Sequence, residues 1–192
     1  MDKVFKGLLL IILVCTFVAC GQTEVEITIE KITPVDTIFT YDTLTPVGFK
    51  KSKKFKVEGL TKANSAYYGF FKEDPKVDYE VRFYDSHQDA VEFGTSFAEE
   101  RTGEDAVLKK DKATWKEGVK EARSCAGNPH GSNVGAKGGQ LVAHDIQSCM
   151  YVKYADYVIY GNMIILCAGW DSDGSMRNCQ KLIHKLTTPS AE

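Results

Sequence analysis

The residues best suited to chemistry in this chain are four cysteines in its C-terminal part, Cys125, Cys149, Cys167 and Cys179. In an exported protein, an even number of cysteines is typical of a disulfide framework. In a cytosolic protein, the same residues would favour metal binding or redox catalysis. The compartment of the protein therefore decides how these cysteines are interpreted.

The first residues of the chain indicate export. Lys3 and Lys6 precede a short apolar run, and the sequence Phe-Val-Ala-Cys at residues 17–20 has small residues where a signal peptide is cut. Residues 17–20 resemble the lipobox of bacterial lipoproteins, and this resemblance covers only the first twenty residues.

The lipobox resemblance implies a signal peptide of residues 1–19 and acylation of Cys20 by palmitate-type chains. The protein would then be extracytoplasmic and anchored to a lipid bilayer through Cys20, because two or three acyl chains hold far more firmly than one. Gly21 follows where Asp often signals inner-membrane retention, so the outer membrane is expected if the host is diderm.

Two alternatives to the lipid anchor remain. An uncleaved transmembrane helix is disfavoured because the apolar stretch at residues 7–19 has thirteen residues, and a helix needs roughly 20 to span a bilayer. An ordinary secretory signal cut near Ala19 would leave a soluble exported protein.

A predicted β-hairpin restricts the possible disulfides. Tyr160-Gly161-Asn162-Met163 favours a two-residue turn, and pairing residue 160 with 163 places Asp156 opposite Cys167. Cys149 lies seven residues before Asp156, about 23 Å along an extended strand. A disulfide needs Cα atoms within about 7 Å, so the sequence excludes a bond between Cys149 and Cys167.

Two disulfide connectivities survive this argument. We favour Cys125 with Cys149 and Cys167 with Cys179, because the second bond ties the last strand to a helix that folds directly back on it. The crossed pairing, Cys125 with Cys167 and Cys149 with Cys179, is the alternative.

His130 and His144 are the candidate residues for a metal or an active site, because they lie between Cys125 and Cys149. Their spacing matches no zinc pattern, and the chain carries no G-x-S-x-G or H-E-x-x-H motif. We therefore expect no metal, no cofactor and no catalytic residues, with an envelope hydrolase built on loops around these histidines as the alternative.

Composition limits the class of partner. The chain has a formal net charge of −2 and is 43% apolar, which suits a packed domain and gives no reason to expect a nucleic-acid partner. Residues 50–56 contain a cluster of lysines that is either a solvated strand face or a contact for anionic lipid or polysaccharide. An envelope protein or glycan is the expected partner beside the bilayer.

We divide the remaining chain into a Thr-rich extended tether at residues 20–52 and one α+β domain at residues 53–188. Alternating residues at 25–29 leave open a strand that docks on the domain. The predicted fold is an antiparallel sheet with a C-terminal β-hairpin, packed against two to three helices and stapled by disulfides.

The elements follow from hydrophobic periodicity. Strands are predicted at residues 55–58, 66–71, 78–84, 141–147, 150–160 and 164–168. Helices are predicted from Ser86 to just before Gly103, from about residue 115 to about 127, and at the end of the domain, where Asp171 caps the last helix. The function that this sequence predicts is non-catalytic binding at the bacterial envelope.

Overall fold

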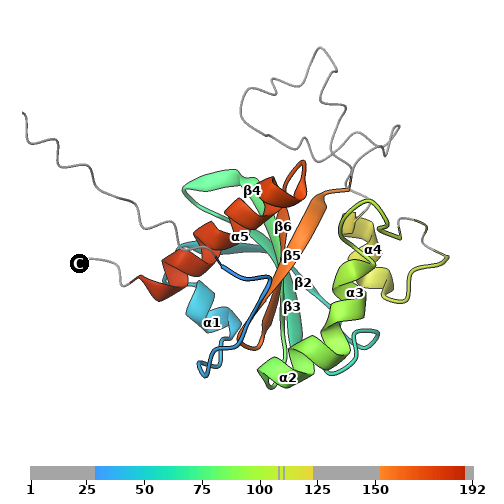
Figure 1. The fold of residues 1–192 in the computed structure, drawn as a ribbon, viewed down its shortest axis with the longest axis horizontal. Helices are drawn as coiled ribbons and strands as arrows, with labels where there is room; N and C mark the ends of the chain where they lie inside the picture. Colours follow the sequence, from blue (N-terminus) through green and yellow to red (C-terminus); the bar gives the residue numbers. More distant parts are fainter. Residues whose placement is uncertain (1–28, 108, 110, 123–151, 189–192) are drawn as a thin grey trace, which may run out of the picture.

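The computed structural model describes residues 29–107, 109, 111–122 and 152–188. These residues form a sheet with helices on both faces (Figure 1). The elements are, in chain order, β1 (Ile32–Thr33), α1 (Tyr41–Leu44), β2 (Phe49–Phe55), β3 (Ser65–Phe71), β4 (Asp74–Phe83), α2 (His87–Asp89), the π-helical turn η1 (Ala90–Gly94), α3 (Thr95–Glu99), α4 (Lys116–Ala122), β5 (Tyr154–Tyr160), β6 (Met163–Ala168) and α5 (Ser172–Thr187).

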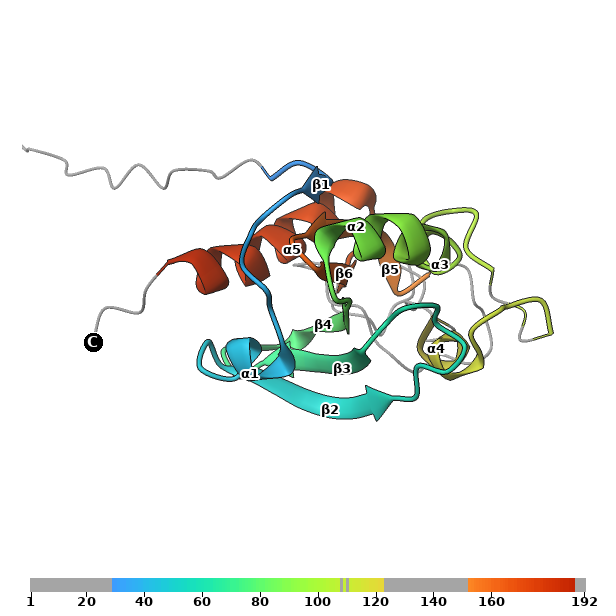
Figure 2. The ribbon, with the colours of Figure 1, turned by 90° about the horizontal axis from the view of Figure 1, so that it is seen from below.

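The six strands are ordered β1-β5-β6-β4-β3-β2. All neighbouring strands are antiparallel except β1, which pairs in parallel with β5. Figure 2 shows β1 and β2 at opposite ends of this sheet. The α+β fold class is confirmed, and the parallel pairing makes the sheet mixed rather than purely antiparallel.

The predicted hairpin register is confirmed. Tyr160 pairs with Met163, and Asp156 pairs with Cys167. The hairpin buries both faces, because α5 packs on one side of it and α2–α3 on the other (Figure 1). The face toward α5 carries Val158, Met163, Ile165 and Cys167, and the opposite face carries Tyr157, Ile159, Ile164 and Leu166.

The predicted boundary between residues 52 and 53 falls inside β2, so the folded domain begins earlier than expected. Residues before 53 supply β1, α1 and most of β2, and Leu44 is fully buried in the core. The prediction of an extended tether is therefore wrong for this part of the chain, because a Thr-rich composition does not distinguish an exposed tether from a segment that forms the helix α1 and pairs with the sheet.

The helix predicted after Ser86 begins as expected, because the Ser86 hydroxyl accepts a hydrogen bond from the Asp89 N–H at 3.0 Å. It then passes through η1 and ends as α3. Gly94 allows the close approach of η1 to the sheet, since a Cβ there would lie 2.4 Å from Ile164 Cδ1. The predicted strand at 141–147 lies outside the described residues, and β5 is described from Tyr154.

Candidate functional site

Of the predicted disulfides, the structure contains Cys167–Cys179, with Cα atoms 5.6 Å apart. The bond joins β6 to α5, and both residues are fully buried. It excludes the crossed connectivity, because each of these two cysteines already has its partner. The other predicted site residues, Cys20, Cys125, His130, His144 and Cys149, lie outside the described residues.

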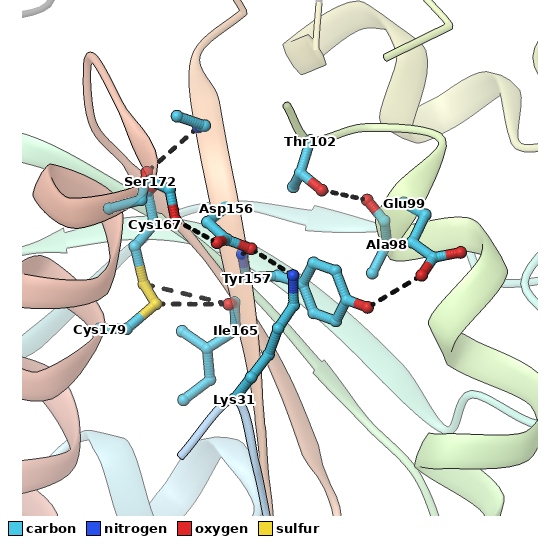
Figure 3. Close-up of polar contacts among 12 residues, drawn as sticks. Lys31, Ala98, Glu99, Thr102, Asp156, Tyr157, Ile165, Cys167, Ser172 and Cys179 are labelled. Carbon is cyan, nitrogen blue, oxygen red and sulfur yellow. Dashed lines mark hydrogen bonds and ion pairs between the residues drawn. A yellow bond between two sulfur atoms is a disulfide. The ribbon is translucent and has the colours of Figure 1, made fainter. Parts of the chain in front are cut away.

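Asp156 on β5 joins three segments of the fold (Figure 3). Its carboxylate accepts hydrogen bonds from Lys31 Nζ at 2.7 Å, from Ser172 Oγ at 2.5 Å and from the Tyr157 N–H at 2.8 Å. Burial alone would raise the pKa of Asp156, but these donors outweigh it and hold the pKa below its ordinary value. Asp156 therefore ties the N-terminal segment and the start of α5 to the sheet as an anion.

Tyr157 extends this arrangement toward α3. Lys31 Nζ lies 4.3 Å from the centroid of the Tyr157 ring, and the Tyr157 hydroxyl donates to Glu99 at 3.4 Å. Burial, together with the Glu99 carboxylate, raises the pKa of Tyr157 to about 12. The hydroxyl is consequently protonated at neutral pH and acts as a donor rather than as a base.

A charged cluster is buried on the face of the sheet under α3 and α4. Glu80 and Arg82 are fully buried on β4, and Arg101 is 3% exposed. Glu80 Oε1 accepts from Arg82 Nε at 2.7 Å, and Glu80 Oε2 lies 2.8 Å from Arg101 Nη2. The Trp115 ring centroid lies 4.8 Å from the Arg82 guanidinium, a cation–π distance.

Lys153 forms a second buried contact near this cluster. Its side chain is 1% exposed, and its Nζ lies 2.8 Å from both Asp78 Oδ2 and the Tyr68 hydroxyl. Burial raises the pKa of the neighbouring Tyr154 well above its ordinary value, so this hydroxyl stays neutral. These paired charges lie inside the packed structure and hold its parts together.

A cleft of about 490 Å³ with a mainly polar lining lies between the start of β4 and the start of α5. β4 makes this cleft because it runs past the end of β6, with Tyr79 paired to Cys167. The first residues of β4 therefore face residues 169–171, which connect β6 to α5. The lining residues are Asp74, Lys76, Val77, Gly169, Trp170, Asp171, Gly174, Arg177, Asn178 and Lys181.

Local chemistry shapes the floor of the cleft. Asp171 is the predicted cap of the last helix, and its carboxylate accepts from the Gly174 N–H at 2.6 Å. Gly169 allows the segment between β6 and α5 to pack closely against α5, because a Cβ at this position would be 2.4 Å from the Ser175 N. The Asn178 side chain donates to the Ala168 carbonyl at 2.7 Å, which joins α5 to the end of β6 at the base of the cleft.

The profile of a family of unknown function (DUF6810) matches residues 40–188. This chain belongs to the DUF6810 family. Searches of curated proteins and of solved structures find no match. The matched region contains the whole cleft, the buried charged cluster and the disulfide, whereas Cys20 precedes it.

Sequence reasoning predicted only Asp171 among the residues that line the cleft in this DUF6810 chain. The one available signal for the cleft is the length of β4, because a strand that is longer than its neighbour extends past the end of that neighbour.

The predicted cluster of lysines lies on β2, the edge strand of the sheet, where Lys50, Lys51 and Lys54 are exposed. Among the residues described for this family member, no helix is long and apolar enough to cross a membrane.

Proposed function

We propose that this protein is a lipid-anchored extracytoplasmic lipoprotein whose single domain binds an envelope molecule without catalysing its conversion. The observation that best supports this proposal is the buried Cys167–Cys179 disulfide. Disulfides persist in oxidising compartments and are rare in the cytosol, where thiols are kept reduced. The bond thus agrees with export, which the lipobox resemblance at residues 17–20 implies independently.

The length of chain between Cys20 and the folded domain fits an anchored protein. The first described residue, Ile29, is nine positions after Cys20, and nine extended residues reach about 31 Å. Acylated Cys20 would hold the domain within this distance of the bilayer. The domain would remain free to meet partners at the envelope surface.

The cleft favours binding over catalysis. Its volume of about 490 Å³ lies within the roughly 300–1,000 Å³ range of small-ligand sites. Among the residues that the structure describes, its lining contains no serine, cysteine or histidine, the commonest nucleophiles and general bases. Of its two carboxylates, Asp171 caps α5 and Asp74 lies 3.9 Å from Lys181 Nζ.

Metabolic labelling with a fatty acid tests the anchor. The wild-type protein should incorporate the label, and Cys20→Ala should abolish it and block normal processing. Cys15→Ala is the matched control, because this cysteine lies inside the predicted signal peptide and should leave labelling unchanged. Label that persists in Cys20→Ala, or that never appears in the wild type, would contradict the proposal.

A further inference from the structure

We propose that the cleft between β4 and α5 binds an anionic group, a carboxylate or a phosphate, through Lys76 and Arg177. This inference rests on the proposed binding function and names the ligand chemistry of the same cleft. Lys76 stands on the overhanging part of β4, and Arg177 stands on α5 across the cleft.

The charge of the lining favours an anion. Lys76, Arg177 and Lys181 supply three positive charges, and Asp74 and Asp171 supply two negative charges, so the lining has a formal net charge of +1. The whole chain has a formal net charge of −2. The cleft therefore carries a net positive charge on a negatively charged protein, which favours an anionic ligand over a cationic one at this site.

The two acidic residues and Lys181 are already engaged within the protein. The Asp171 carboxylate accepts from the backbone of α5, while Asp74 lies beside Lys181, whose Nζ also donates to Asn178 Oδ1 at 3.0 Å. These contacts leave little negative charge available to cations that enter the cleft.

Lys76 and Arg177 differ from Lys181 because neither forms an ion pair or side-chain hydrogen bond with any residue that the structure describes. Arg177 Nη2 lies 3.8 Å from the position that a Cβ on Gly174 would occupy, so the guanidinium lies beside the first turn of α5. A guanidinium binds carboxylate or phosphate through two parallel hydrogen bonds, and an ammonium adds a point charge.

The remaining lining limits the body of the ligand. Val77 and Trp170 give the cleft an apolar portion, and its volume of about 490 Å³ exceeds what a bare inorganic ion would fill. A sugar-sized molecule that carries one anionic group fits both the charge and the volume. Two sources supply such a group at a bacterial envelope, namely carboxylated sugars and phosphorylated molecules.

The test is a tryptophan-fluorescence titration of the intact protein in a non-ionic detergent. The chain has two tryptophans, and Trp170 lines the cleft whereas Trp115 is 3% exposed elsewhere. The probes are glucuronate and inorganic phosphate, with glucose as the uncharged comparison. We expect a saturable response to at least one anion and none to glucose, and the responding probe identifies the carboxylate or phosphate source.

Lys76→Gln combined with Arg177→Gln should weaken the binding of that anion at least tenfold. Lys112→Gln combined with Lys116→Gln is the matched control, since it removes the same charge from two exposed residues outside the cleft and should change binding less than twofold. Both residues of the test pair are exposed, so thermal unfolding should confirm an unchanged fold.

Three results would overturn this inference: no saturable response to either anion, an equal response to glucose, or equal weakening by the test and control pairs. The last result would mean that the net charge of the protein, and not the cleft, attracts the anion. None of these results affects fatty-acid labelling of Cys20, so failure of the ligand inference is distinguishable from failure of the anchor proposal.

Discussion

The side-chain amide of Asn162 bonds both backbone groups of Phe39, 123 residues earlier in the chain. The Phe39 N–H donates to Asn162 Oδ1 at 2.7 Å, and Asn162 Nδ2 donates to the Phe39 carbonyl at 3.0 Å. The same Nδ2 also donates to the Tyr84 carbonyl at 2.8 Å. A turn residue of the C-terminal hairpin thus holds the N-terminal segment and the end of β4 together.

Asn162→Ala should lower the free energy of unfolding by about 2–4 kcal/mol, because it leaves buried backbone groups of Phe39 and Tyr84 without partners. Urea denaturation measures this loss. Asn64→Ala is the control, since the Asn64 side chain is exposed and makes one hydrogen bond to Asp85; it should cost under about 1 kcal/mol. Equal effects of the two substitutions would contradict the role assigned to Asn162.

Asp156 should make the protein sensitive to acid. Its pKa is lowered in the folded state, so its contribution to stability is present above the unfolded pKa of about 4 and is lost as pH falls through the folded value. Melting temperatures across this acidic range should fall less steeply in Asp156→Asn than in the wild type. Asp105→Asn, at an exposed carboxylate, should keep the wild-type pH dependence. A wild-type slope in Asp156→Asn would refute the prediction.

Glu80→Gln should be one of the most destabilising single substitutions in the chain. It leaves the positive charges of Arg82 and Arg101 buried without the carboxylate between them, and breaking one partner of a buried ion pair costs about 3–5 kcal/mol. Chemical denaturation compared with Glu104→Gln, an exposed glutamate, measures the difference. A loss below about 1 kcal/mol would show that Glu80 does not stabilise these arginines.

Removing the Cys167–Cys179 disulfide by a double Cys→Ala substitution should cost about 3 kcal/mol, the loop-entropy value for a short loop. The two cysteines are 12 residues apart. Non-reducing peptide mapping should recover this linked pair together with the predicted Cys125–Cys149 pair. A peptide that links Cys149 to Cys167 would contradict the hairpin register, and four free thiols would contradict export to an oxidising compartment.

The sequence determined the features that depend on neighbours along the chain. The Gly161-Asn162 turn sets the register of β5 on β6, because a two-residue hairpin loop leaves one pairing for the flanking strands. That register excluded a Cys149–Cys167 bond, and the helix that follows β6 directly favoured the Cys167–Cys179 bond that the structure contains. The Asp171 cap was predictable for the same local reason.

Only the tertiary structure decided what meets across the fold. Glu80 and Arg82 alternate with apolar residues, a pattern typical of a strand with one solvent-exposed face, yet both faces of β4 are buried. The apolar face packs in the core with α5, and the charged face packs against Arg101 and Trp115. The pairing of β1 with β5 and the cleft beneath α5 likewise join segments more than 90 residues apart. The hydrophobic periodicity of a segment shows which of its residues share a face. Which other segment packs against that face depends on the fold of the whole chain.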